Sequence, residues 1–246
     1  MRQSVLLGAL GIALFLAGWE VVGQTGALGM SCPPLSAVLA VLADPARALL
    51  FQRALGATLG AVATGYGLGL VFGVVAAAAG HLLPGMRGGL DRTSSVIHAI
   101  PSVALAPLLI LSLGRQATPA ALAGINTYFI LYVATSSGLA GTSPVLRDLM
   151  SVLGAGRWMR FVRIDLPAAL PTLVSGMRMA APGALIGAII GEWFGASRGV
   201  GVIILNAMQN FQIALLWSMV LLTVMISLTL FWLLGAMQLG AARRYR

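Results

Sequence analysis

The sequence predicts an all-α polytopic membrane protein with six transmembrane helices, and two observations carry this prediction. First, 59% of the 246 residues are hydrophobic and only 9% are charged, whereas soluble domains carry about 25% charged residues. Second, charged segments separate six apolar blocks, and about 20 apolar residues suffice to cross a bilayer as a helix. The blocks are residues 5–22, 54–80, 93–114, 118–140, 171–195 and 215–237. We expect residues 1–246 to form a single transmembrane domain without a separate soluble domain.

The first block follows Met1 and Arg2, and it is either a secretion signal or a retained helix. A cleaved signal has a short apolar core followed by a small-residue cleavage site. The stretch from Ala17 to Glu20 lacks the cysteine of a lipoprotein site. We therefore expect a retained first helix.

Glycines recur at four-residue spacing in the second and fifth blocks. They are Gly56, Gly60, Gly65, Gly69 and Gly73, and then Gly183, Gly187, Gly191 and Gly195. Helices in lipid are held together by close backbone approach at small residues, so this spacing favours tight packing over a pore lining. Proline removes a helical hydrogen bond, so we expect kinks or local unwinding at Pro101 and Pro107 in the third block and at Pro182 in the fifth.

The charged residues exclude several classes of function. All fifteen basic residues are arginine, against six acidic residues. Without lysine the chain has no phosphate-binding loop, so it hydrolyses no nucleotide by the common route. The arginines are dispersed rather than gathered into a nucleic-acid-binding patch, which favours contact with anionic lipid and cytoplasmic partners. The lone Cys32 forms no internal disulfide, and we expect no metal site.

The distribution of arginine predicts the orientation of the chain. Short cytoplasmic loops carry the excess of arginine. With the N-terminus inside, the cytoplasmic set is Arg2, Arg87, Arg92, Arg147, Arg157, Arg160, Arg163, Arg243, Arg244 and Arg246. The outer set is Arg47, Arg53, Arg115 and Arg198. We expect both termini and the loop of residues 141–170 to be cytoplasmic.

This loop carries a distinctive pattern. An apolar stripe at helical spacing runs through Leu146, Leu149, Met150 and Leu153. After a glycine break at residues 154–156, the aromatic and apolar residues Trp158, Phe161 and Val162 share one helical face, and Arg157, Arg160 and Arg163 form a basic row that Pro167 ends. Two such short helices suit docking into a groove of a partner protein or lying on lipid headgroups, and composition leaves both readings open.

The loop resembles the EAA motif of the inner-membrane permease subunits of binding-protein-dependent ABC importers. In that motif, E-A-A is followed by three residues, a glycine, nine residues and I-x-L-P. The matching residues are Gly154, Ala155, Ile164, Leu166 and Pro167, whereas Asp148 replaces the glutamate, and Leu149 and Met150 replace the alanines. Residues 33–38 and 100–110, and residues 191–196 together with 199–201, are similar to the corresponding segments of the nitrate, sulfonate and taurine type of permease.

The resemblance implies a division of labour in a bacterial inner membrane. Two permease copies, expected to form a homodimer, make the pathway. Two separate ATP-binding subunits hold ATP and Mg²⁺, and an extracytoplasmic binding protein delivers a small solute such as a nitrate, sulfonate or taurine-like or small nitrogenous compound. This chain is then non-catalytic and carries no cofactor. The residues expected to couple to the ATPase are Asp148, Gly154, Ala155, Arg157, Arg160, Phe161, Ile164, Leu166 and Pro167. Within this set, Gly154 is the expected bend, and Arg157, Arg160 and Phe161 are the expected docking face.

Polar residues inside the blocks are candidates for lining the pathway, and each has a structural alternative. Arg178 either snorkels to the interface, which we favour, or attracts an anionic solute. Glu192 is expected to make a structural pair or cap rather than a solute contact. Asn126 and Tyr128 either form interhelical hydrogen bonds or line the conduit.

Two other classes of protein are alternatives to a permease. Ser94 and His98 share a helical face at i, i+4 and invite an intramembrane serine hydrolase hypothesis, but no oxyanion site or second-helix base accompanies them. We prefer a polar contact of Ser94 and His98 with a neighbouring helix, and both are also candidates for lining the pathway. A secondary transporter requires ion-coupling acids near the midplane, and only Glu20 and Glu192 come near it, both close to span ends.

Overall fold

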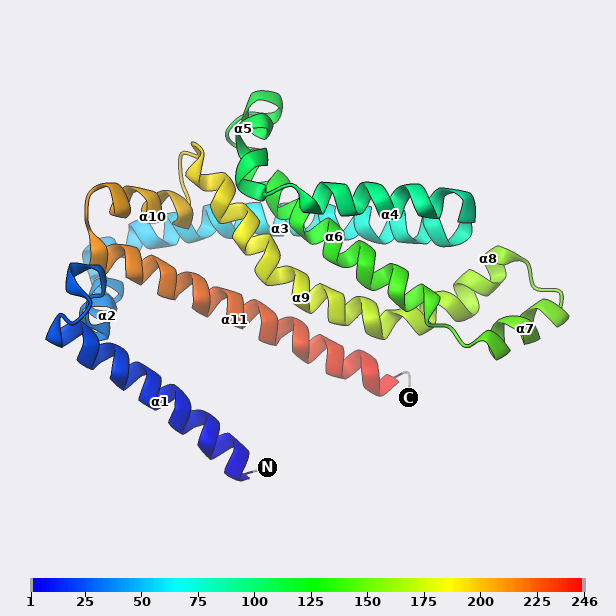
Figure 1. Ribbon diagram of the computed structural model, residues 1–246, viewed down its shortest axis with the longest axis horizontal. Helices are drawn as coiled ribbons and strands as arrows, with labels where there is room; N and C mark the ends of the chain where they lie inside the picture. The colour runs from blue at the N-terminus through cyan, green and yellow to red at the C-terminus, as the bar shows by residue number, and fades with distance from the viewer. Residues whose placement is uncertain (1, 245–246) are drawn as a thin grey trace.

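The computed structural model describes residues 2–244, and the side chains of residues 6–236. Arg246, which contributes to the predicted charge bias, lies outside the described residues. The described chain is built from helices in the order shown in Figure 1. These are α1 (Arg2–Thr25), the 3₁₀ turn η1 (Gly29–Ser31), α2 (Leu35–Ala43), α3 (Pro45–Leu82), α4 (Pro84–Ala99), α5 (Ser102–Leu113), α6 (Thr118–Ala140), α7 (Pro144–Val152), α8 (Arg157–Arg160), the π-helix η2 (Phe161–Asp165), α9 (Leu166–Trp193), α10 (Val200–Gln209) and α11 (Ile213–Arg244).

The described helices provide between four and six candidate membrane crossings. Four described segments are long and apolar enough to cross a membrane alone, namely Leu6–Thr25, Pro45–Leu82, Arg157–Trp193 and Ile213–Ala236. Two bent pairs, α4 with α5 and α6 with α7, raise the number to as many as six. The predicted all-α fold is therefore confirmed, and α6 coincides with the predicted fourth span.

The third predicted span, residues 93–114, is not one straight helix. The chain turns by 98° between α4 and α5, at Ile100, whose backbone is extended with φ −75° and ψ 122°. The residue before a proline is disfavoured in helix, which explains the break at Pro101. By contrast, α5 continues through Pro107 and α9 continues through Pro182.

Three predicted connectors are largely helical. Residues 45–53 belong to α3, residues 84–92 begin α4, and residues 200–209 form α10. Arginines mark the ends of the apolar blocks in the sequence, but a helix can continue past the hydrocarbon core once its side chains reach water.

Helices α3, α6 and α9 form the centre of the bundle, with α11 packed on α9. Glycine makes this close approach possible. A Cβ on Gly69 of α3 would lie 2.5 Å from the Gly124 carbonyl oxygen of α6, and one on Gly187 of α9 would lie 2.6 Å from the Leu122 carbonyl oxygen. The predicted packing role is confirmed for these glycines. Gly56 and Gly60 pack against no other helix of the described chain.

Helix α1 stands apart from this centre, and in Figure 1 it reaches the rest of the molecule only near α2 and the start of α11. Its C-terminal end is fixed by polar contacts. Trp19 Nε1 donates to the Pro33 carbonyl at 3.0 Å, and Glu20 accepts from the backbone N–H of Ser36 at 2.8 Å. The ring of Trp19 also lies 5.2 Å from that of Trp217 in α11.

Candidate functional site

The loop between the fourth and fifth spans forms two short helices separated by a glycine turn. Helix α7 ends with paired hydrogen bonds, from the Ala155 N–H to the Met150 carbonyl at 2.9 Å and from the Gly154 N–H to the Ser151 carbonyl at 3.0 Å. This is the Schellman pattern, which requires a left-handed residue after the helix, and Gly154 supplies it with φ +75°. Gly154 is therefore the turning point between α7 and α8.

The expectation that Pro167 ends the helical run is wrong. Helix α8, the π-helix η2 and α9 follow one another without interruption, and Pro167 lies in the first turn of α9. A proline has no N–H to donate four residues back, and the preceding turn is widened, with the Leu166 N–H bonded to the Phe161 carbonyl. The loop is therefore rigidly continuous with the fifth span.

One side of α7 carries apolar side chains that nothing in the described chain covers. Val145 is 74% exposed, Val152 85% and Leu153 69%, and Leu149 on the same side is exposed as well. Trp158 in α8 is also exposed. Asp148 lies on this exposed helix. Of the predicted apolar stripe, Leu146, Leu149 and Leu153 are exposed, whereas Met150 is half-buried.

The opposite side of the loop is packed into the bundle. Phe161 is 7% exposed and forms a buried cluster with Leu139 of α6 and Ala169 of α9. The expectation that Phe161 lies on a docking face is therefore wrong, because its ring points inward and contacts the spans. The remaining motif residues Ala155, Ile164, Leu166 and Pro167 are half-buried.

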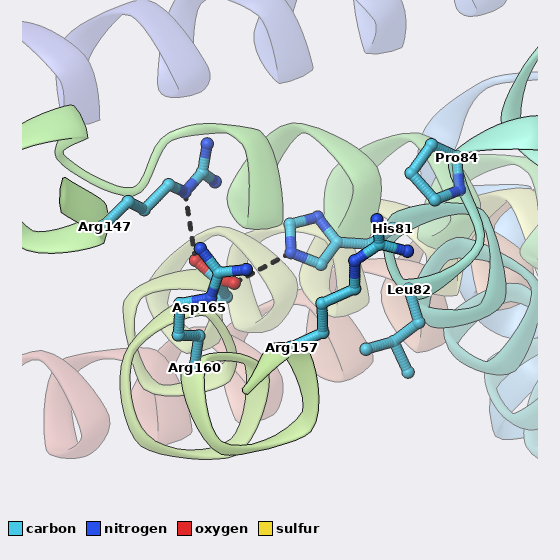
Figure 2. Close-up of a pocket in the computed structure, with 7 residues that line it drawn as sticks. All are labelled: His81, Leu82, Pro84, Arg147, Arg157, Arg160 and Asp165. Carbon is cyan, nitrogen blue, oxygen red and sulfur yellow. Dashed lines mark hydrogen bonds and ion pairs between the residues drawn. The ribbon is translucent and has the colours of Figure 1, made fainter. Parts of the chain in front are cut away.

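A buried carboxylate ties this loop to two spans. Asp165 Oδ2 lies 2.8 Å from His81 Nε2 at the end of α3, and Asp165 Oδ1 accepts from Arg147 Nε of α7 at 3.3 Å (Figure 2). Arg147 Nη2 also donates to the Leu139 carbonyl at the end of α6, at 2.6 Å. We call Asp165, His81 and Arg147 the Asp165 cluster. It connects α3, α6, α7 and η2 at one point.

The sequence alone did not single out the Asp165 cluster. His81 is 84 residues from Asp165 in the chain, so no local pattern links the two. The available signal was that an acid occupies the variable position of the I-x-L-P segment, beside apolar residues on both sides. A buried acid of this kind requires a partner.

Arginine side chains of the loop surround a cavity beside the Asp165 cluster. The cavity has a volume of about 200 Å³ and is lined by His81, Leu82, Pro84, Arg147, Arg157, Arg160 and Asp165 (Figure 2). Arg160 Nη1 donates to Ser151 Oγ of α7 at 2.9 Å, which braces α8 against α7. Arg163 is exposed on η2 and does not line the cavity.

The candidate pathway residues do not gather in one place. Ser94 is fully buried, and its hydroxyl lies 2.8 Å from the Tyr128 hydroxyl of α6. The His98 ring stacks on Phe129 with centroids 3.9 Å apart. Ser94 thus makes the expected polar contact with a neighbouring helix, whereas the contact of His98 is aromatic stacking. Ser94 and His98 do not form a nucleophile–base pair.

Asn126 and Glu192 serve as structural links. Asn126 accepts from Ser102 Oγ of α5 at 3.1 Å and donates to the Gly183 carbonyl of α9 at 3.3 Å. Glu192 accepts from Thr58 Oγ1 of α3 and from the Gly201 N–H of α10, both at 2.7 Å. The predicted cap role of Glu192 is confirmed, since its carboxylate holds the first turn of α10.

Arg178 packs between two helices. Its guanidinium lies 3.8 Å from the centroid of the Phe231 ring in α11. This is a cation–π contact, in which the face of the aromatic ring attracts the positively charged guanidinium. Arg178 thus joins α9 to α11.

Comparison with known proteins places this architecture in a family. Residues 69–246 match the family described as "Binding-protein-dependent transport system inner membrane component". A "Probable ABC transporter permease protein" of Haemophilus influenzae is 32% identical over 95% of this chain and 97% of its own length. The "Formylaminopyrimidine transport permease protein ThiX" of Halalkalibacterium halodurans is 30% identical over 79% of this chain and 78% of its own. The "Putative aliphatic sulfonates transport permease protein SsuC" of Bacillus subtilis is 28% identical over 86% and 77%.

The described chain agrees with the family in its helical, membrane-spanning architecture. Members of this family work with ATP-binding and solute-binding partners, so a transport role without nucleotide chemistry of its own fits the lysine-free sequence. The chain therefore belongs to the family of binding-protein-dependent transport system inner membrane components, and it is a multi-pass permease subunit of an ABC importer.

Proposed function

We propose that this permease is driven through the loop of residues 141–170, whose α7–α8 unit docks into an ATP-binding subunit. The observation that carries the proposal is that the loop has two unlike sides. Its outer side presents exposed apolar residues, and its inner side is anchored to three spans by Phe161 and Asp165. A loop built this way receives a force on one side and passes it on from the other.

The docking face consists of Val145, Leu149 and Val152 of α7, Leu153 directly after it, and Trp158 of α8. Large exposed apolar patches mark interaction sites, and these residues follow one face of a short helix, as helix-in-groove recognition requires. Asp148 lies on the same helix and supplies a charge beside this face. Arg157 and Arg160, which the sequence predicts to lie in the docking face, line the cavity beside the Asp165 cluster instead. Gly154 fixes the angle between the two helices.

The Asp165 cluster and the Phe161 packing transmit the motion. Both lie between the loop and the ends of α3, α6 and α9. A rigid link moves the spans together with the loop, whereas a flexible connector would absorb the motion. A conformational change of the spans requires contacts that differ between two states of the transporter. The contacts between the loop and the ATP-binding subunit are the ones that change when ATP binds and when it is released.

The orientation follows from the number of crossings and the arginine bias. With six crossings, both termini and the loop between the fourth and fifth spans lie on the same side. Arg87, Arg147, Arg157, Arg160 and Arg163 fall on that side, and we assign it to the cytoplasm by the positive-inside rule. The opposite side, with α2 and α10, then faces the solute-binding protein.

The assembly contains two copies of this chain and two ATP-binding subunits, which hold ATP and Mg²⁺. Residues 1–246 act as one transmembrane domain that forms half of the pathway and is surrounded by membrane lipid. The names of the relatives mention formylaminopyrimidine and aliphatic sulfonates. We accordingly expect a small organic or inorganic solute, either nitrate, sulfonate or taurine-like or a small nitrogenous compound.

The test is co-purification with the ATP-binding subunit of the same transporter. Leu149→Asp places a charge on the docking face without touching the anchored side. Met30→Asp is the matched control, since Met30 is 89% exposed in η1, outside the loop. The ATP-binding subunit should be lost from Leu149→Asp and retained by Met30→Asp, with equal yields of both permeases. Equal recovery of the ATP-binding subunit with both variants would refute the docking proposal.

A further inference from the structure

The cavity beside the Asp165 cluster carries more positive charge than the chain neutralises. Three arginines, Arg147, Arg157 and Arg160, line it together with a single acid, Asp165. Both oxygens of that acid are already engaged, one by Arg147 and the other by His81. The positive charges of Arg157 and Arg160 therefore remain without an acidic partner in the described part of the chain.

The two remaining guanidiniums differ in how they are held. Arg160 makes a single hydrogen bond to the neutral Ser151 hydroxyl, which fixes its position without cancelling its charge. Arg157 makes no hydrogen bond or ion pair with any residue that the structure describes. Arg157 and Arg160 line the same cavity as His81 and Asp165 (Figure 2). Like charges brought together in this way repel one another, and a bound anion removes that repulsion.

We propose that this cavity is a binding site for a phosphate group, with Arg157 and Arg160 as its main ligands. Arginine binds phosphate through paired N–H donors in a fixed fork. The cavity, about 200 Å³ in volume, has room for one phosphate group, and Leu82 and Pro84 supply an apolar wall. The site is distinct from the docking face, which lies on the other side of α7, and it does not depend on any ATP-binding subunit.

The phosphate group has two sources. It belongs either to an anionic phospholipid headgroup at the membrane surface or to a soluble phosphate. The cavity lies where α3 ends and α4 begins, beside the exposed apolar residues Leu83 and Met86, so a lipid headgroup can reach it while its chains remain in the bilayer. In either case the anion joins α8 to the α3–α4 turn, and it braces the loop near its anchor.

The experiment uses the full-length permease without the ATP-binding subunit, so that nucleotide sites do not contribute. In the first arm, inorganic phosphate is titrated into the protein in a neutral detergent and binding is followed by calorimetry. In the second arm, the melting temperature is measured in nanodiscs of phosphatidylcholine with and without phosphatidylglycerol. Both arms compare the wild type with Arg157→Gln and Arg163→Gln. Arg157 has no partner to lose, so its replacement should leave the fold intact, and the exposed Arg163 matches it in charge but lies outside the cavity.

We expect Arg157→Gln to weaken binding of the phosphate group about tenfold, because it removes a charge-assisted contact. The effect should appear in the arm whose ligand, soluble phosphate or phosphatidylglycerol, is the one that the site binds. Arg163→Gln should match the wild type. Loss in the phosphate arm identifies a soluble ligand, and loss of the phosphatidylglycerol-dependent rise in melting temperature identifies a lipid headgroup. The proposal is overturned if Arg157→Gln matches the wild type in both arms, or if both variants lose binding equally.

Discussion

Replacement of Gly69 by alanine should push α3 away from α6 in the centre of the bundle. A Cβ at this position would lie 2.5 Å from the Gly124 carbonyl oxygen and 2.6 Å from Thr127 Cβ, both in α6. Ordinary van der Waals contact begins at 3.4 Å, so α3 and α6 must move apart by roughly 0.9 Å at this point. The obstacle is backbone, so rotation of a side chain cannot relieve it.

The magnitude follows from two opposing effects. Overpacking of a tight interface costs about 1–3 kcal/mol, and contact with backbone places Gly69→Ala in the upper half of that range. Alanine also gains up to about 1 kcal/mol over glycine in helix propensity. We expect Gly69→Ala to lower the free energy of unfolding by about 1–2 kcal/mol.

Gly67 provides a control on the same helix. A Cβ on Gly67 meets nothing within 4 Å, so Gly67→Ala should keep the propensity gain and be neutral or stabilising. The assay is reversible unfolding of both purified variants in mixed micelles with increasing sodium dodecyl sulfate, followed by circular dichroism. If Gly69→Ala proves as stable as Gly67→Ala, the assigned contact between α3 and α6 is wrong.

Two further predictions concern the loop. Asp165→Asn removes the negative charge shared by His81 and Arg147, and it should lower the free energy of unfolding by about 1–3 kcal/mol. The variant should still bind the ATP-binding subunit but transport less solute per ATP hydrolysed. An unchanged ratio of solute transported to ATP hydrolysed would count against transmission through this cluster. Gly154→Ala forces alanine into a left-handed backbone conformation at a cost of about 1–2 kcal/mol, and it should slow ATP-driven uptake into proteoliposomes. Gly156 has an ordinary φ of −66°, so the control Gly156→Ala should leave uptake unchanged. Equal uptake rates of the two variants would argue against a fixed turn at Gly154.

The positions of the spans were predictable where apolar sequence and membrane thickness coincide. The fourth span shows this best, since α6 begins at Thr118 and ends at Ala140 as expected. Helix ends beyond the bilayer were not predictable from charge. Arg47 and Arg53 in α3, and Arg87 and Arg92 in α4, lie inside helices, because an arginine interrupts an apolar block without interrupting a helix.

The loop of residues 141–170 likewise has some features that its local sequence predicts and others that it does not. The apolar stripe of α7 and the turn at Gly154 depend on local periodicity and on a local backbone conformation, and the sequence specifies both. The direction of the Phe161 ring depends on where the end of α3 lies, as does the partner of Asp165. Both belong to tertiary structure, which no spacing within residues 141–170 encodes.

The central claim, that α7 docks into the ATP-binding subunit, is tested most directly by cross-linking. Val152→Cys is introduced together with Cys32→Ser, and the assembled transporter is treated with a reagent that joins a thiol to an amine. This chain contains no lysine, so apart from its N-terminus the amine must come from a partner. We predict a product between Val152→Cys and the ATP-binding subunit, and none from Met30→Cys in the same background. No product from Val152→Cys, or equal products from both positions, would contradict the account.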